Sequence, residues 1–227
     1  MRNPVANTLK DGTISIDHTT VPKLKYQLFG FSGKKALLVC LELNNIHVKS
    51  GKYDWGYMVK RALFGDGCAA IVASGEDVTN TSGKWAIESN LSHMKPPPHI
   101  VTLWTNHKGF DGHISPDVPK YLKSALRPFV DRLLKEQNLT DPSEVDLWGI
   151  HPGGPSILRA CQSALELNSE KLEESWDSLK NYGNMSAASI WFIIEKLLKK
   201  KDDNARTLLA LGFGPGVNME GVMLRKC

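Results

Sequence analysis

A chain of 227 residues and 25.1 kDa is long enough to bury a sizeable core, and its 41% hydrophobic and 23% charged residues exclude a disordered or fibrous protein. The formal net charge of +4 mildly favours an anionic ligand, but the basic residues are spread along the chain except at 199–201, so we do not expect nucleic acid as a partner. The longest apolar runs are far shorter than the roughly 20 residues of a membrane-spanning helix, so we expect no membrane partner.

The four cysteines indicate a reducing environment. They form no CxxC pair of the kind found in redox and zinc sites; they are Cys40, Cys68, Cys161 and Cys227. The first residues, MRNPVANTLKDGT, lack the apolar stretch of a secretory signal. We therefore expect a cytoplasmic protein.

The first third of the chain predicts two buried strands around a helix. Residues 1–33 are polar and irregular and carry little structural signal. The apolar run at 35–41 predicts a buried strand, which the polar pair Asn44-Asn45 follows. Residues 57–64 have helical spacing that stops at Gly65-Asp66-Gly67, and the apolar run at 68–73 predicts a second strand.

A change of composition indicates a boundary in the middle of the chain. Residues 74–98 are rich in Ser, Thr, Asn, Gly and Pro, apart from a short alternating piece at 85–89, and the three prolines at 96–98 end any strand. We therefore divide the chain into an N-terminal segment (1–33), a first unit (34–95) and a second unit (96–227).

The second unit alternates helices with strands. Apolar residues at spacings of three and four predict a helix over 118–134. A strand at 145–150, a turn at 151–154 and a helix at 155–167 with proline at its first position follow. A further helix is predicted over 186–201, and two strands at 207–213 and 217–224 are joined across Gly214-Pro215-Gly216. The fold class is α/β.

His151 stands in the sequence LWGIHPGGP, where the predicted strand ends and the next helix begins. Ligands collect at the carboxyl ends of strands in open α/β sheets, and helix N-termini favour negative charge. A catalytic imidazole would suit this place, but a lone histidine can equally fill the end of a strand. The residue alone does not decide between the two.

Asn184, in YGNMSAAS, precedes a helix that is apolar on most of its surface. It could cap that helix, which is a common use of asparagine, or donate a fixed hydrogen bond to a carbonyl oxygen that becomes negative. The later GFGPG sequence, residues 212–216, is not a dinucleotide-binding loop, because a strand and not a helix follows it. A turn that lines a pocket is the better interpretation.

Taken together and in this order, GIHPGGP, YGNMSAAS and GFGPG resemble the type III polyketide synthases, the chalcone and stilbene synthase family of the thiolase superfamily. The sequences LFGDG at 63–67 and LVCLE at 38–42 are similar to further family motifs. The resemblance extends over residues 34–227 and implies a thiolase-like layered α-β-α-β-α fold. This chain would be a partial copy, with the end of the N-terminal half and the complete C-terminal half.

The resemblance also implies a reaction. Family members transfer an acyl group from a CoA thioester to a cysteine and condense it with malonyl-CoA by a decarboxylative Claisen reaction, without a cofactor. Their histidine and asparagine hold the thioester carbonyl and stabilise the enolate; by motif these residues are His151 and Asn184. The loop Gly212, Phe213, Gly214, Pro215 and Gly216 would shape the cavity in which the polyketide folds.

The nucleophilic cysteine of the family was not found in this chain. Family members carry it in a QGCxAG-like turn, whereas Lys25–Gly30, which resembles the stretch before that turn, runs directly into the strand at 35–41. Each of the four cysteines is interpreted as a structural or surface thiol. We therefore expect impaired condensation in this chain.

Two positions that resemble the aromatic gates of the plant enzymes carry smaller residues, Val48 and Gly112. They would widen the channel to the cavity and favour a starter other than a plant coumaroyl group. Val48 is accordingly a predicted substrate-binding residue.

Two functions from different classes follow. The first is an acyltransferase that uses malonyl-CoA and an acyl-CoA starter, and the second is a non-catalytic truncated isoform that pairs with a full-length synthase. The family resemblance also implies a homodimer. No metal site is expected, because His93, His99, His107 and His113 have no familiar ligand spacing and are predicted to lie in loops.

Overall fold

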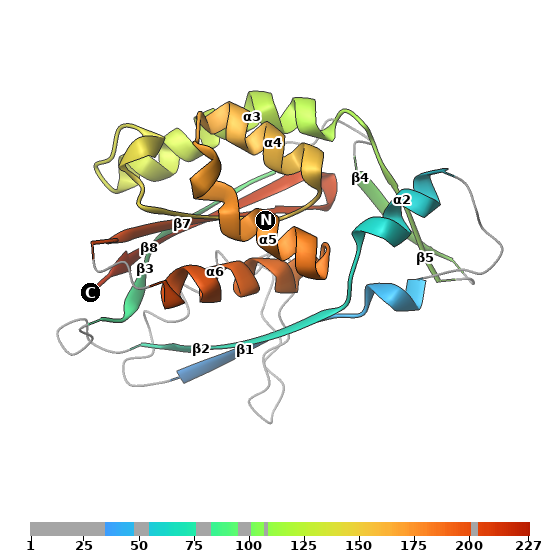
Figure 1. Ribbon diagram of the computed structural model, residues 1–227, viewed down its shortest axis with the longest axis horizontal. Helices are drawn as coiled ribbons and strands as arrows, with labels where there is room; N and C mark the ends of the chain where they lie inside the picture. Colours follow the sequence, from blue (N-terminus) through green and yellow to red (C-terminus); the bar gives the residue numbers. More distant parts are fainter. Residues whose placement is uncertain (1–34, 48–54, 76–82, 95–100, 107–108, 201–203) are drawn as a thin grey trace, which may run out of the picture.

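A mixed four-stranded sheet lies at the centre of the computed structural model, which describes residues 35–47, 55–75, 83–94, 101–106, 109–200 and 204–227 (Figure 1). Its strands, in the order β3-β8-β7-β6, are β3 (Trp85–His93), β8 (Asn218–Lys226), β7 (Thr207–Gly214) and β6 (Leu147–Ile150). β6 and β7 are parallel, whereas β8 is antiparallel to both of its neighbours. A parallel pair needs a long crossover connection, and α4, α5 and α6 lie within it.

Helices cover both faces of this sheet (Figure 1). α3 (Val118–Glu136) and α4 (Pro155–Leu165) pack on one face, and α6 (Ser189–Lys199) packs on the other. Leu209 and Leu211 belong to the core beneath α3 and α4, whereas Leu208 and Ala210 belong to the core beneath α6. Burial of β7 on both faces explains why its sequence is a continuous apolar run.

α5 (Glu173–Tyr182) and the 3₁₀ turn before it, η4 (Ser169–Leu172), lie beside the edge strand β6 and bond to backbone groups of β6 and of the residues before it. The buried Ser175 hydroxyl accepts a hydrogen bond of 3.1 Å from the Ile150 amide. Lys171 Nζ donates to the carbonyl oxygens of Val145 (3.0 Å) and Asp146 (2.7 Å). These contacts cover part of an edge that could otherwise pair with another chain.

A second layer of strands lies on the far side of α6 (Figure 1). β1 (Lys35–Glu42) and β2 (Gly67–Ser74) form an antiparallel pair, and the thiol of Cys40 interacts with the Trp191 side chain of α6. Alternate residues point away from α6 and are 55–64% exposed; they are Leu37, Val39, Leu41 and Val72. Two strands that are apolar on both faces are typical of a buried sheet, yet no described element covers this outer face.

Shorter elements surround the end of the molecule that carries α2 (Trp55–Leu63). They include the 3₁₀ turn η1 (Asn44–His47) and the hairpin of β4 (Val101–Asn106) and β5 (Gly109–Ile114). β3 precedes the boundary expected at residue 96 but pairs with β8, so the main sheet extends across that boundary. The division into segments 1–33, 34–95 and 96–227 stays a prediction.

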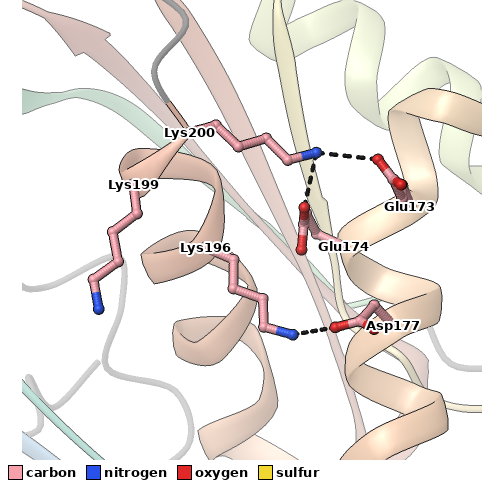
Figure 2. A pocket seen from close by; sticks show the side chains of 6 residues that line it. All are labelled: Glu173, Glu174, Asp177, Lys196, Lys199 and Lys200. Carbon is pink, nitrogen blue, oxygen red and sulfur yellow. Dashed lines mark hydrogen bonds and ion pairs between the residues drawn. The ribbon is translucent and has the colours of Figure 1, made fainter.

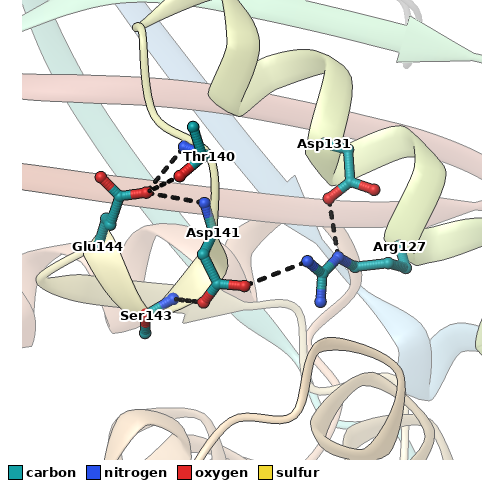
Figure 3. A network of polar contacts seen from close by, with 6 residues as sticks. All are labelled: Arg127, Asp131, Thr140, Asp141, Ser143 and Glu144. Carbon is teal, nitrogen blue, oxygen red and sulfur yellow. Dashed lines mark hydrogen bonds and ion pairs between the residues drawn. The ribbon is translucent and has the colours of Figure 1, made fainter.

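The connection from α3 to β6 is fixed by a polar network (Figure 3). Asp141 caps the 3₁₀ turn η3 (Pro142–Glu144) by accepting from the Ser143 amide at 2.9 Å, while the Glu144 carboxylate accepts from the Asp141 amide at 2.8 Å. Arg127 of α3 also donates to Asp141, at 3.2 Å. The Ser143 hydrogen bonds, with help from Arg127, hold the pKa of Asp141 below its ordinary value. The network sets where β6 begins.

Most of the predicted elements are observed, with bounds that differ from the prediction by one to three residues. The helix predicted over 186–201 begins at Ser189, after the 3₁₀ turn η5 (Ser186–Ala188). The strand predicted from residue 145 begins at Leu147, because Val145 follows the 3₁₀ turn η3 and donates its amide back to Pro142.

Candidate active site

His151 directly follows β6 and is held by backbone contacts on both sides. Its amide donates to the Leu211 carbonyl of β7 at 2.8 Å, and its carbonyl accepts from the Gly153 amide at 2.9 Å. Gly154, with φ 150°, then occupies the N-cap position of α4, and Pro155 opens the helix. The predicted strand, turn and helix around His151 are thus confirmed.

The imidazole of His151 lies in a dry environment. The residue is 8% exposed, and desolvation by burial lowers the pKa of its side chain from 6.5 to about 4. The ring is therefore neutral at neutral pH. A neutral imidazole keeps one N–H donor and one acceptor nitrogen.

Asn184 lies in the loop between α5 and α6 and is 5% exposed. It does not cap α6, because that helix begins at Ser189 with Ala188 at its N-cap position. Its side-chain oxygen instead accepts from the Ser186 amide at 2.9 Å. With the oxygen occupied in this turn, the Nδ2 group is left to donate elsewhere, and it points toward the Gly153 carbonyl at 3.5 Å.

The backbone of Asn184 is held by the segment that follows α2. Its amide donates to the Leu63 carbonyl at 2.8 Å, and its carbonyl accepts from the Gly65 amide at 3.0 Å. The two segments approach so closely that a Cβ on Gly65 would lie 2.2 Å from the carbonyl oxygen of Tyr182. Gly183, at φ 71° and ψ −164°, adopts a conformation that is nearly exclusive to glycine. The glycines of LFGDG and YGN therefore permit this contact.

Ion pairs join the two helices that flank the Asn184 loop (Figure 2). Lys196 of α6 pairs with Asp177 of α5, and Lys200 pairs with Glu173 at 3.1 Å and with Glu174 at 2.8 Å. These residues line a charged surface hollow together with Lys199. Opposite charges in this hollow are paired with one another, so we assign it a structural role.

The two predicted catalytic residues both border Gly153. The amide of Asn184 lies 3.5 Å from the Gly153 carbonyl, and the His151 ring carbon Cδ2 lies 3.6 Å from where a Gly153 Cβ would stand. The residue after β6 and the loop before α6 thus place an imidazole and a primary amide next to the same glycine. Their catalytic roles stay predictions.

The four cysteines differ in how deeply they are buried. Cys161 is fully buried in the core beneath α4, where burial raises the pKa of its thiol to about 12. Cys40 is partly buried, and desolvation again raises the pKa of its thiol. Cys68 and Cys227 are exposed. A nucleophilic cysteine needs a lowered pKa, which neither buried thiol has.

The GFGPG residues end β7 and form the turn into β8. Gly212, Phe213 and Gly214 belong to β7, and Pro215 and Gly216 belong to the 3₁₀ turn η6 (Pro215–Val217), where Gly216 has φ 72°. The joined strands are as predicted, while a substrate-binding role for this loop stays a prediction. Val48 lies outside the described residues.

Two of the four histidines considered for a metal site lie in the part of the chain that the structure describes. His93 and His113 lie in strands β3 and β5, and not in loops as expected, while His99 and His107 fall outside the described residues. The ring of His93 stands 6.3 Å from that of Phe129. Within the described part of the chain, no group of three or more His, Cys, Asp or Glu side chains could hold a metal ion. None of the described helices is long and apolar enough to cross a membrane.

Comparison with known proteins relates this chain to one family. Residues 97–227 match the family model described as the C-terminal domain of chalcone and stilbene synthases. The chain belongs to the chalcone and stilbene synthase family. One similar relative is the "alpha-pyrone synthesis polyketide synthase-like Pks18" of Mycobacterium tuberculosis, which is 34% identical over 194 residues. The matched residues make up 83% of this chain and 49% of that relative. The 1,3,6,8-tetrahydroxynaphthalene synthase of Streptomyces peucetius is 31% identical over 89% of this chain and 54% of its own length.

Solved structures of chalcone and stilbene synthase relatives show the same fold. PKS-I from the brown alga Ectocarpus siliculosus superposes with a TM-score of 0.80 at 32% identity, covering 86% of this chain and 53% of that one. The type III domain of Steely1 from Dictyostelium has a TM-score of 0.81 at 24% identity. The thiolase-like α/β fold is therefore confirmed. The chain spans about half the length of the curated relatives it matches.

Proposed function

We propose that His151 and Asn184 form the decarboxylating part of a type III polyketide synthase site and act on malonyl-CoA. The observation that supports this is that both residues lie next to Gly153, and that the Asn184 oxygen accepts from the Ser186 amide while its Nδ2 group faces the Gly153 carbonyl with a second N–H that can donate elsewhere. Two donors aimed at one oxygen are what a developing enolate needs.

In the proposed reaction the C–C bond between the malonyl carboxylate and the α-carbon breaks. Carbon dioxide leaves, and the bonding electron pair moves to the α-carbon and the thioester oxygen as an enolate. The Asn184 Nδ2–H and the neutral His151 N–H donate to that oxygen. A proton from water then converts the enolate to acetyl-CoA, unless an acyl group is attacked first.

Burial of His151 supports its role as a donor and not as a cation. Because the pKa of its side chain is about 4, the ring is uncharged at neutral pH and its hydrogen-bond strength does not vary there. In a dry site such a donor stabilises negative charge more than it would in water.

The wider reaction follows from family membership. We propose an acyltransferase of the polyketide synthase class that condenses malonyl-CoA onto an acyl-CoA starter, uses CoA thioesters as its only small-molecule partners and needs no cofactor. The names of two relatives refer to α-pyrone synthesis and to a tetrahydroxynaphthalene, so a cyclised polyketide is the proposed class of product. Condensation by the chain alone is impaired in this proposal, because none of its four cysteines fits the nucleophile.

The test is to incubate purified protein with malonyl-CoA and measure acetyl-CoA by chromatography. Asn184→Ala should lower the rate about a hundredfold, the usual cost of removing one oxyanion donor. Asn181→Ala is the matched control, since this exposed asparagine near the end of α5 bonds only to Asp177 in the described structure, at 2.7 Å. An unchanged rate in Asn184→Ala would refute the proposal.

A second candidate function is that of a non-catalytic partner of a full-length synthase. It is favoured by the exposed outer face of β1 and β2, with Leu37, Val39, Leu41 and Val72 at 55–64% exposure. Apolar patches of this kind mark association surfaces. The homodimer expected for the family is the related alternative.

Size-exclusion chromatography with light scattering separates these possibilities. The partner function predicts that the chain elutes in a mixed complex when a full-length type III synthase is added. If the chain elutes as a monomer both alone and with the synthase added, that result would contradict both the partner function and the homodimer.

A further inference from the structure

Four hydrogen bonds form a closed ring around Asn184. Asn44 Nδ2 donates to the Gly65 carbonyl at 2.6 Å, and the Gly65 amide donates to the Asn184 carbonyl at 3.0 Å. The Ser186 amide donates to Asn184 Oδ1 at 2.9 Å, and the Ser186 hydroxyl donates to Asn44 Oδ1 at 3.2 Å. The ring joins η1, the segment after α2 and the loop before α6.

The chemistry of the ring fixes how the Asn44 amide is oriented. The Gly65 carbonyl can only accept, so the NH₂ group of Asn44 must face it. The Asn44 oxygen then faces Ser186, whose hydroxyl can donate. Each end of the Asn44 side chain is therefore used, and the side chain spans the gap between two segments that both contact Asn184.

The turn that contains Asn44 is held by hydrogen bonds of its own. The neighbouring Asn45 donates its backbone amide to Asp66 Oδ1 at 2.8 Å and its Nδ2 group to Asp66 Oδ2 at 3.0 Å. Two hydrogen bonds to one carboxylate hold η1 against the residue that follows Gly65. Asn44 is thus anchored to the chain independently of its contact with Ser186.

We propose that Asn44 is a positioning residue that keeps the Asn184 side chain with Nδ2 directed at the substrate; this rests on the proposed decarboxylation. Asn44 holds Ser186, and the Ser186 amide holds Asn184 Oδ1. If Ser186 moves, the Asn184 side chain is free to rotate and present its oxygen to the enolate, which repels it. A donor must be held in place before the charge develops in order to stabilise it.

The kinetic test compares Asn44→Ala with Asn45→Ala. Asn44→Ala should lower kcat for malonyl-CoA decarboxylation about tenfold while KM changes less than about twofold. Asn45→Ala removes a side-chain bond between the same two segments but leaves the ring intact, so its kcat should stay close to that of the wild type. Equal kcat losses in the two variants would show only that the turn had loosened and would overturn the proposal.

A double variant tests whether the effect of Asn44 on kcat depends on Asn184. In an Asn184→Ala background, Asn44→Ala should cause no further loss of kcat, because the group that it positions is gone. Ser186→Ala breaks the same ring at its other side chain and should lower kcat like Asn44→Ala, which keeps the test valid if one variant folds poorly. Additive losses with Asn184→Ala would refute the positioning role.

A measurement without catalysis separates this inference from the proposed function. In protein labelled with ¹⁵N asparagine, the side-chain amide signal of Asn184 is identified by its loss in Asn184→Ala. It should shift in Asn44→Ala and stay in place in Asn45→Ala. An unmoved signal in Asn44→Ala overturns the positioning role. A wild-type rate equal to that of Asn184→Ala instead overturns the proposed function, and the amide signal then decides the positioning role alone.

Discussion

The backbone amide of Gly65 donates a 3.0 Å hydrogen bond to the carbonyl of Asn184, although 119 positions separate the two residues. This hydrogen bond joins the segment after α2 to the loop before α6. It also shows why the first unit of the chain matters to a site whose named residues both lie in the second. Without the Gly65 segment, one side of the Asn184 backbone would lack its partners.

Gly65→Ala should therefore destabilise the protein strongly. The added Cβ would stand 2.2 Å from the Tyr182 carbonyl oxygen, a backbone atom that cannot rotate away. We expect a loss of about 3 kcal/mol or more in the free energy of unfolding, measured by urea denaturation. Gly83→Ala is the control, because it has φ 79° but nothing within 4 Å, and it should cost only about 1 kcal/mol. Similar losses for both variants would show that the close contact is absent in solution.

Burial of His151 predicts a pH dependence of stability. The pKa of its side chain is about 4 in the folded protein and 6.5 in its ordinary state. Well above pH 6.5 the imidazole is neutral in both states, so its effect there is constant. As the pH falls from 6.5 toward 4, the unfolded chain binds a proton that the folded protein does not, and the free energy of unfolding declines. The total loss, complete below the folded pKa, is on the order of 3 kcal/mol.

The measurement is urea denaturation of the wild type and of His151→Gln between about pH 4 and about pH 7. Other groups titrate in both proteins, so their contributions cancel in the difference between the two curves. That difference should decline with falling pH. Parallel curves would show that His151 is hydrated and titrates normally in the folded protein.

Elements with a strong local pattern were predictable from the sequence. The long amphipathic helix α3 and the doubly buried strand β7 carry their periodicity in their own residues. α5 was missed, because it is mostly polar and buries serines, Ser175 and Ser178, instead of an apolar stripe. The sequence analysis also contains no hairpin at β4 and β5, although Asn106 and Gly109, which pair with each other, are residues that a turn favours at its two ends.

Only the residues of the candidate site that lie in a recognisable motif could be predicted from the sequence. His151 and Asn184 were named from the resemblance, whereas the ring through Asn44 and Gly65 depends on contacts between distant segments. The one local signal was the polar pair Asn44-Asn45 shortly after the first apolar run. β3 also depends on contacts between distant segments. Only its first residues, 85–89, alternate between apolar and polar, and its polar end, including Ser92 and His93, is a strand because it pairs with β8. Tertiary pairing here overrides local preference.

The environments of the cysteines predict their reactivity with iodoacetamide. Cys68 and Cys227 are exposed and should be alkylated first in the native protein. Cys40 should react slowly, because burial raises the pKa of its thiol and lowers the thiolate fraction, and Cys161 should resist until the chain is unfolded. Peptide mass spectrometry over time, with a urea-treated sample as the control, gives the order. Faster alkylation of Cys40 than of Cys68 would indicate an activated thiol and make Cys40 a candidate nucleophile.

The two faces of β1 should respond oppositely to charge. Val39 is 55% exposed on the outer face, whereas the adjacent Leu38 points toward α6 and is partly buried. Val39→Lys should change the free energy of unfolding by less than about 1 kcal/mol, because Lys at an exposed strand position loses little packing. It should also weaken any association through this face, seen as a lower mass by light scattering. Leu38→Lys should cost about 2–4 kcal/mol, because it places a charge in the covered layer. Equal destabilisation by both variants would mean that the outer face is covered within the folded chain, and the partner function would then lose its support.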